Sequence, residues 1–421
     1  MRTTALSSHP LLTRSQIVAP ALGLPDAAAA LVFGAARLRR PIARDAIAQL
    51  TSLSAATVNR QVTALLDAGL LRERADLAVS GAIGRPRIPV ELNHEPFVVL
   101  GLHIGARTTS IVAADLFGRT LDAVETPTPR GPQGQALAAL AGSARRYLSR
   151  WHRRRPLWVG VAVGGVVEGA AGLVHHPRLG WTSAPVGPVL AETLQLPVSV
   201  ASHVEAMAGA ELLLGKRRSS PASGRHPHGR SSSSLYVYAR ETVGYALVIG
   251  GKVHSPASGP GTIAALPVQS DLLGPSGRLE STVSDEAVLA AARRLCVVAD
   301  GGAATMATLL RAARCGSRPA QELLAERARV LGGAVALLRD MLNPDDLVVG
   351  GQAFTEYPEG MSLVAATCTE RSTLPPRDIR VTVFGSRVQE AGAGVVSLGG
   401  LYADPIGAMR RHARRAEVSV L

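Results

Sequence analysis

Leu53-Ser54-Ala55-Ala56-Thr57-Val58-Asn59-Arg60 opens the third of three short helical patterns near the start of this 421-residue chain. Ser54 is typical of a helix N-cap, because a serine hydroxyl accepts a hydrogen bond from the first helical turn. A helix over Ala55–Asp67 would place four apolar side chains on one face, namely Val58, Val62, Leu65 and Leu66. The opposite face would then carry Ala55, Ala56, Thr57, Asn59, Arg60 and Thr63.

Two earlier helices are predicted at Ala27–Leu38 and Arg44–Leu50. The first ends before Pro41, because proline cannot continue a helix. The spacing of apolar residues within the second helix and just before it predicts one buried face, made of Ile42, Ala46, Ile47 and Leu50. Three short helices in this order predict a helix-turn-helix.

A two-stranded wing is predicted after the third helix. Gly69 suits the position after a helix end, since glycine adopts the left-handed backbone that commonly closes a helix. Arg72-Glu73-Arg74 starts a strand, and Ser80–Gly84 forms the tip of the wing. Gly84-Arg85-Pro86-Arg87 then carries two arginines beside a proline of fixed φ, and such arginines can lie along a narrow minor groove.

We therefore predict that this module binds double-stranded DNA. Small side chains at the start of the third helix let it approach a major groove, where Asn59 and Arg60 can hydrogen-bond base edges or phosphates. The expected DNA-binding residues are Ser54, Ala55, Ala56, Thr57, Asn59, Arg60, Thr63, Arg85 and Arg87. The alternative is a three-helix packing unit inside an enzyme, and the wing together with the positive charge favours DNA.

The formal net charge of +13 is concentrated in a few segments. Residues 1–92 hold eleven arginines and six acids, a net charge of +5, and Leu140–Arg155 holds six arginines and no acid. Nucleic acid is a natural partner for such segments, although arginine-rich solvated faces are common and charge alone is weak support.

A larger α/β body is predicted from Phe97 onwards. Strands are expected at Phe97–Leu102, Thr109–Asp115, Thr120–Thr126 and Leu157–Val163. Gln135–Arg150 has the period of a helix, and helices alternate with strands to the end of the chain. This alternation predicts the α/β class.

The sequence divides into four parts. We expect a flexible N-terminal arm over residues 1–25, the winged helix-turn-helix over residues 26–92, the body over residues 96–404 and a basic C-terminal tail over residues 405–421. Within the body, residues 216–234 are polar and low in complexity, which predicts a disordered insertion.

The order of these features resembles the transcriptional-regulator branch of the ROK family, in which a winged helix-turn-helix precedes a sugar-kinase-like body. The resemblance covers Asp26 to about Asp404 and is strongest in residues 42–92 and in four body segments. These are Val159-Gly160-Val161-Ala162-Val163, Leu179-Gly180-Trp181, Leu196-Pro197-Val198 and Leu342–Gly351. It implies a two-lobed, actin-like ATPase fold whose C-terminal helices build a homodimer.

The body departs from the family where phosphoryl transfer needs phosphate loops, a metal ligand and a base. The family's Asp-Ile-Gly-Gly-Thr hairpin is His103-Ile104-Gly105-Ala106-Arg107 here, and its Gly-Thr-Gly-Ile-Gly turn is Arg240-Glu241-Thr242-Val243-Gly244. Ser202-His203 stands in place of the Asn-Asp pair that supplies the catalytic base. We therefore expect no catalytic residue, no cofactor and no kinase activity.

Positions that contact sugar and zinc in the family are changed as well. The family's Pro-Asn-Leu-Gly-Trp is Pro177-Arg178-Leu179-Gly180-Trp181, and its Gly-Glu-Ile-Gly-His is Gly261-Thr262-Ile263-Ala264-Ala265 in a register uncertain by one residue. The family's cysteine triplet is missing from Leu272–Glu280, and the chain's three cysteines lack the close spacing of a zinc site or a disulfide framework. We expect no metal.

Two interpretations of the altered cleft remain open. Cationic and titratable side chains could favour an anionic ligand such as a phosphorylated sugar or an organic acid, namely Arg107, Arg178, His175, His176 and His203. Alternatively the pocket has decayed and the body serves dimerisation alone. The expected effector pocket consists of Arg107, Arg178, Ser202, His203 and Thr262.

We thus expect a homodimeric, cytoplasmic repressor that binds a DNA operator and responds to a sugar or an anionic sugar derivative. The sequence has no run of 18 apolar residues, so no membrane span is expected. One alternative is a ROK-type sugar kinase with an appended DNA-binding module. Another is a protein that binds nucleic acid without sequence preference through its arginine-rich segments.

Overall fold

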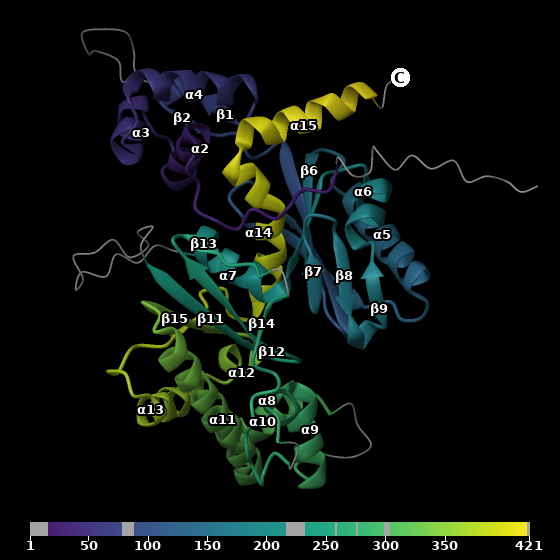
Figure 1. The fold of residues 1–421 in the computed structure, drawn as a ribbon. Helices are drawn as coiled ribbons and strands as arrows, with labels where there is room; N and C mark the ends of the chain where they lie inside the picture. The colour runs from purple at the N-terminus through teal and green to yellow at the C-terminus, as the bar shows by residue number, and fades with distance from the viewer. Residues whose placement is uncertain are drawn as a thin grey trace, which may run out of the picture. The chain divides into compact units, whose positions relative to one another are not determined.

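The computed structural model describes residues 16–77, 88–215, 232–256, 259–274, 277–298 and 304–418 (Figure 1). Contacts divide the chain into two compact units: Met1–Leu214 with Glu390–Leu421, and Gly215–Gln389. Among the described residues, no helix has both the length and the apolar character needed to cross a bilayer.

The first unit begins with the winged helix-turn-helix. Its elements are α2 (Ala28–Leu38), α3 (Arg44–Thr51), α4 (Ala55–Asp67), β1 (Leu71–Glu73), η1 (Ala75–Leu77) and β2 (Val90–Leu92). The three predicted helices are confirmed, and β1 pairs antiparallel with β2. The prediction that Leu50 is buried was wrong. Leu50 is 45% exposed, because α3 ends one residue later and the chain turns away through Ser52 at φ 57°.

A five-stranded sheet of order β10-β6-β3-β4-β5 forms the centre of the first unit. Its strands are β3 (Phe97–Ile104), β4 (Thr108–Ala114), β5 (Thr120–Pro127), β6 (Arg155–Val163) and β10 (Val198–Ser202). β10, β6 and β3 are parallel, whereas β4 and β5 continue antiparallel. Every residue of β3 is buried, as expected for a strand covered on both faces.

Helices cover both faces of this sheet. α5 (Gln133–Ser149) and α6 (Val186–Leu194) pack on the apolar side chains of one face. α14 (Val388–Ala403) lies on the other face, where Gly101 and Gly160 leave room for it. A Cβ at Gly160 would lie 2.2 Å from the backbone nitrogen of Ser397, so this close approach requires glycine.

The first unit also contains a second, smaller sheet and two further helical segments. They are β7 (Val166–Glu168), β8 (Leu173–His176), η2 (Pro177–Leu179), β9 (Trp181–Ala184) and α7 (His203–Leu214). β7, β8 and β9 form a separate three-stranded antiparallel sheet.

Residues 16–25, which the sequence placed in a flexible arm, are packed against the first unit. Ile17 forms a parallel bridge with Val198, and the backbone N–H of Val18 donates to the carbonyl of Val198 at 2.9 Å. Leu22 is 4% exposed and lies against Gly209 of α7. The reason is physical: β10 is an edge strand, and the extended segment satisfies its backbone hydrogen-bonding groups.

The prediction of a basic tail over residues 405–421 was also wrong, because Pro405–Val418 forms the helix α15. The Asp404 carboxylate accepts the backbone N–H of Gly407 at 2.9 Å at the start of this helix. Ala408 and Met409 are buried, and α15 packs on α2 and α4. Burial of these two apolar side chains therefore stabilises the docked helix, although its arginines favour contact with solvent.

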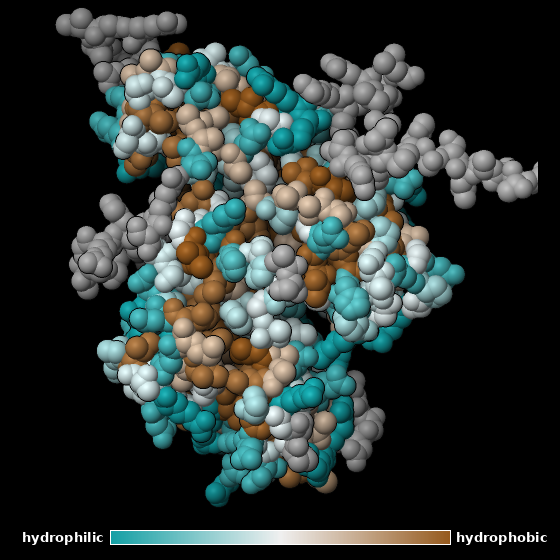
Figure 2. Space-filling view, in the orientation of Figure 1, coloured by the Kyte–Doolittle hydropathy of each residue, from teal (hydrophilic) through white to brown (hydrophobic). Residues whose placement is uncertain are grey.

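The second unit contains a six-stranded sheet with a helical layer. Its strands are β11 (Ser233–Ala239), β12 (Val243–Ile249), β13 (Lys252–Val253), β14 (Gly261–Thr262), β15 (Asp346–Gly350) and β16 (Arg380–Val381). Its helices are α8 (Leu279–Val283), α9 (Asp285–Arg294), α10 (Met306–Arg314), α11 (Arg318–Leu342), α12 (Gln352–Thr355), η3 (Pro358–Gly360), α13 (Met361–Arg371) and η4 (Gly385–Arg387). Hydrophilic residues line the outer edge of the helical layer (Figure 2).

The predicted insertion over residues 216–234 is shorter than expected. Ser233 and Ser234 already belong to β11, where Ser234 pairs with Val248 of β12 and with Asp346 of β15. The side chain of Asp345 accepts the backbone N–H of Ser233 at 2.8 Å, which fixes the start of the strand. Residues 216–231 lie outside the described part of the chain.

Candidate functional site

The helix α4 presents a polar face on an apolar base. Val58, Val62 and Leu65 have no exposed surface, and they fix the helix in the core of the module. The hydroxyl of Ser54 caps the helix by accepting the backbone N–H of Thr57 at 3.2 Å. The opposite face is exposed at Ser54, Ala55, Ala56, Asn59, Arg60 and Thr63, with Thr57 partly buried.

Arg44 braces this face from α3. Its guanidinium donates to the side-chain oxygen of Asn59 at 3.3 Å and forms an ion pair with Glu73 of β1 at 3.2 Å. Because the oxygen of Asn59 is engaged, its NH2 group is the end directed to an external acceptor. The exposed Arg60 follows on the same helix.

In the described part of the wing, two arginines are paired with carboxylates. Arg72 and Arg74 both bind Glu91, at 2.7 and 2.9 Å, and Arg74 also pairs with Asp76 at 2.6 Å. These contacts raise the pKa of both guanidinium groups, chiefly through hydrogen bonds to the carboxylates. The predicted DNA contacts Arg85 and Arg87, in Gly84-Arg85-Pro86-Arg87, lie outside the described residues.

The module is attached to the body through α2. Arg37 donates to the backbone carbonyl of Leu213 at the end of α7, at 2.9 Å. Its guanidinium lies 4.0 Å from the ring centroid of Tyr402 on α14, and the Tyr402 hydroxyl donates to the carbonyl of Leu116. A single side chain therefore joins the winged helix-turn-helix to two helices of the body.

A second contact lies where α2 leads into α3. The guanidinium of Arg40 stacks 3.5 Å from the ring centroid of Phe117, in the turn between β4 and β5. His94 packs against the same ring at 4.8 Å. Asp115, which is 2% exposed, holds the turn by accepting the backbone N–H groups of Phe117 and Arg119.

The basic end of α15 is partly neutralised. Arg411 lies 3.6 Å from the carboxylate of Asp404 and 5.6 Å from the ring of Trp158. Arg410, one residue earlier, is exposed. The helix also contacts α4 directly.

A three-histidine cluster, made of His103, His176 and His203, lies in the first unit. The rings of His103 and His203 are stacked, with centroids 6.0 Å apart and planes 4° from parallel. His176 is 6% exposed and packs edge-on against Trp181. The predicted pocket residue Ser202 directly precedes His203 and is 2% exposed.

The other predicted pocket residues lie elsewhere. Arg107 and Arg178 are exposed, on the β3–β4 hairpin and on η2. Thr262 belongs to the second unit, where its side-chain oxygen accepts the N–H of Ala264 at 3.1 Å. His103 was absent from the predicted pocket, although it replaces the aspartate of the family hairpin. His176 was named among the side chains that could favour an anionic ligand, and strand alternation turns it inward.

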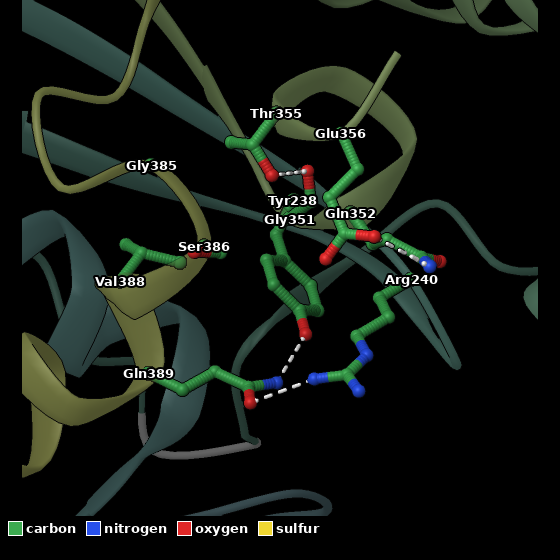
Figure 3. A pocket seen from close by; sticks show the side chains of 10 residues that line it. All are labelled: Tyr238, Arg240, Gly351, Gln352, Thr355, Glu356, Gly385, Ser386, Val388 and Gln389. Atoms are coloured by element: carbon green, nitrogen blue, oxygen red, sulfur yellow. Dashed lines mark hydrogen bonds between the residues drawn. The ribbon is translucent and has the colours of Figure 1, made fainter. Parts of the chain in front are cut away.

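The second unit holds a small, open pocket (Figure 3). Its lining residues are Tyr238, Arg240, Gly351, Gln352, Thr355, Glu356, Gly385, Ser386, Val388 and Gln389. The amide of Gln389 donates to the Tyr238 hydroxyl and accepts from Arg240, both at 2.8 Å. Burial raises the pKa of Tyr238 to about 12, so its hydroxyl stays protonated at neutral pH. The side chains of Tyr238 and Arg240 thus both engage the amide of Gln389.

Comparison with known proteins places the chain in one family. The ROK family model matches residues 99–371. Transcriptional regulator Rv0485 of Mycobacterium tuberculosis is 71% identical over 411 residues, which cover 96% of this chain and 92% of that protein. The DNA-binding transcriptional dual regulator NagC of Escherichia coli is 22% identical over 368 residues, covering 84% and 87% of the two chains.

Solved structures share the fold. A ROK family transcriptional regulator, described as a homologue of the Escherichia coli MLC protein, aligns with a TM-score of 0.73 and 20% identity over 92% of this chain and 98% of that one. A ROK family glucokinase from Streptomyces griseus aligns with a TM-score of 0.60 and 21% identity over 71% and 99%. The predicted ROK sugar-kinase-like α/β fold is confirmed. The chain belongs to the ROK family and is one of its transcriptional regulators.

Proposed function

We propose that this regulator is a repressor that binds a DNA operator through residues 26–92. The exposed polar face of α4 carries the proposal, since it is held on a buried apolar base and capped by Ser54. A helix presented in this way fits a major groove, with Asn59 and Arg60 reaching the base edges. The rest of that face carries the small side chains of Ala55, Ala56 and Thr63, so DNA can approach the helix closely.

The ion pairs of the described wing support different roles for its arginines. Arg72 and Arg74 are engaged by Glu91 and Asp76, so they stabilise the wing instead of presenting free charge to phosphates. Arg85 and Arg87 remain the proposed minor-groove contacts. The two-fold symmetry of a homodimer would then match two operator half-sites.

We further propose that the body, residues 96–404, has no kinase activity. The fold family implies ATP and a divalent metal, and the changed motifs do not fit either group. His103 stands where the family's phosphate hairpin has an aspartate, so the carboxylate that would help hold the metal is missing at that position. The turn that would cradle a phosphate is Arg240-Glu241-Thr242-Val243-Gly244 here, and the carboxylate of Glu241 would repel a phosphate.

The body then serves as an effector and dimerisation domain in the cytoplasm. Two relatives of this chain are named the DNA-binding transcriptional dual regulator NagC and an N-acetylglucosamine repressor. These names support a sugar or an anionic sugar derivative as the effector class. Arg107, Arg178, Ser202, His203 and Thr262 remain the proposed pocket residues. Sedimentation of the full chain tests the homodimer directly.

Selection of genomic DNA fragments by the full chain, followed by sequencing, tests operator binding. Arg60→Ala should weaken operator binding by about 1–3 kcal/mol and relax discrimination at one base position. Arg318→Ala, which removes an 87% exposed arginine from α11, is the matched control and should bind like wild type. Equal losses on operator and random DNA in Arg60→Ala would contradict a base-reading role.

A coupled ADP-release assay with a panel of hexoses tests the inactive body. Turnover above the enzyme-free blank would favour the alternative of a sugar kinase with an appended DNA module. Binding of random fragments as tight as binding of selected ones would favour the alternative without sequence preference.

A further inference from the structure

A bridge of three polar side chains joins α4 to the rest of the winged helix-turn-helix. Arg44 of α3 donates from one guanidinium nitrogen to the side-chain oxygen of Asn59 on α4, at 3.3 Å. A second guanidinium nitrogen binds the carboxylate of Glu73 on β1, at 3.2 Å. One guanidinium therefore connects the helix that is proposed to enter the major groove with the helix before it and with the wing.

The three elements that carry the bridge are held by buried apolar side chains. Ile47 of α3 and Val58 of α4 have no exposed surface, and Leu71 of β1 is 3% exposed. The helix α4 contacts both α3 and β1. Packing of the backbone thus keeps the bridging side chains within reach of one another. The planar guanidinium presents its donors in a fixed fork, so it can bind an amide oxygen and a carboxylate at the same time.

The bridge fixes which end of the Asn59 amide faces the protein. A guanidinium donates hydrogen bonds and cannot accept them, so it selects the oxygen of the amide and not the NH2 group. The oxygen is therefore directed to Arg44, and the NH2 group lies on the other side of the amide carbon. Asn59 is exposed on the outer face of α4, so what it offers to DNA is a pair of N–H donors.

Base pairs differ in what they present to such a donor in the major groove. Guanine has two neighbouring acceptors, O6 and N7, whereas adenine has one acceptor and one N–H donor. An asparagine pairs with adenine by using its oxygen and its NH2 group together. Cytosine presents a donor alone. An asparagine whose oxygen is held by an arginine of the same protein therefore matches guanine better than adenine.

We propose that Arg44 is a specificity-determining residue, which holds the amide oxygen of Asn59 and so makes Asn59 select guanine over adenine at one position of the operator. This inference deepens the proposed repressor function and rests on it. Arg44 is a positioning residue, because it acts on the base through Asn59. Glu73 supports this role, since its carboxylate holds the guanidinium beside α4 against the attraction of a DNA phosphate.

Selection of random DNA by the full chain, followed by sequencing, identifies the base pair that Asn59 contacts. This is the position whose base preference disappears in Asn59→Ala. Titration of duplexes that differ at this position alone then gives the ratio of affinities. In the wild type, guanine should be favoured over adenine by about tenfold.

Arg44→Met keeps a long side chain and removes its donors, so the amide of Asn59 can turn and pair with adenine through both of its ends. Adenine should then gain about tenfold relative to guanine at this position, and preferences elsewhere in the operator should stay unchanged. Arg44→Lys keeps the charge and a donor for the amide oxygen, and should retain more of the guanine preference than Arg44→Met. A role of Arg44 in stability alone would lower affinity without exchanging one base for another.

Arg39→Met is the matched control, because it removes the same charge from an exposed position after α2. It should leave every base preference unchanged. Full retention of the guanine preference in Arg44→Met, or adenine preferred over guanine by the wild type, would overturn the inference while operator binding stands. Equal loss of affinity for all four bases in Asn59→Ala would assign Asn59 to a phosphate and would overturn it as well. A wild type that enriches no sequence would instead overturn the proposed repressor function.

Discussion

Arg37→Ala should loosen the winged helix-turn-helix from the body and let its helices open locally more often, while the second unit stays folded. Arg37 is the side chain of α2 that donates to the Leu213 carbonyl at 2.9 Å and stacks on Tyr402 at 4.0 Å. Both partners belong to the body, on α7 and α14. The variant removes both contacts together and leaves the buried face of α2, including Phe33, in place.

The size of the effect follows from these two contacts. A hydrogen bond from a charged donor contributes about 1.5–3 kcal/mol, and a cation–π contact adds about 0.5–2 kcal/mol. Ordering the long side chain costs about 1–2 kcal/mol of rotamer entropy. The net loss on substitution is therefore about 2 kcal/mol, which corresponds to about 30-fold faster opening of the contact.

Hydrogen exchange of the full chain measures this loss locally, which suits a protein of two units. Amides of α2 and α4 should exchange about 30-fold faster in Arg37→Ala, while those of α11 in the second unit stay unchanged. Arg39→Ala removes an exposed arginine two residues later and is the matched control. Equal exchange in the two variants would refute the view that Arg37 holds the module to the body.

Three further outcomes follow from buried groups. Gly160→Ala should lower the free energy of unfolding by about 1–3 kcal/mol, because the added Cβ would meet the Ser397 backbone at 2.2 Å; chemical denaturation measures this. Arg327→Met should lower the free energy of unfolding of the second unit by about 3–5 kcal/mol, because it removes the guanidinium that the buried Asp285 carboxylate binds at 2.6 Å. Adding Asp285→Asn to Arg327→Met should recover part of this loss. Since the pKa of His203 is lowered to about 4, its stabilising contribution is complete above about pH 6.5 and is lost as the pH falls toward 4; thermal unfolding should show this loss in wild type and less of it in His203→Gln.

The fold of the winged helix-turn-helix could be predicted almost entirely from local sequence. The cap at Ser54, the spacing of Val58, Val62 and Leu65, and Gly69 at φ 71° after α4 all act within one or two turns of the helix. Such signals depend on neighbouring residues and on helical period, so they are readable without the fold. Leu50 was misjudged because its exposure depends on how the chain leaves α3.

The two ends of the chain could not be predicted in this way. Residues 16–25 look like an arm until Val198, far along the sequence, offers an open strand edge to Ile17. Residues 405–418 look like a basic tail until the body and the module supply an apolar surface for Ala408 and Met409. Both errors concern contacts between segments that are distant in sequence, for which period and composition carry no signal.

The sequence by itself determined the winged helix-turn-helix and the α/β class of the body, because both depend on residue identity in local patterns. The tertiary structure alone decided which polar residues meet. It brought His103, His176 and Ser202 to one sheet edge with His203, and it left Thr262 in another unit. The physical reason is that parallel strands gather their carboxyl ends from separate parts of the chain, so a site at that edge exists only once the sheet has formed.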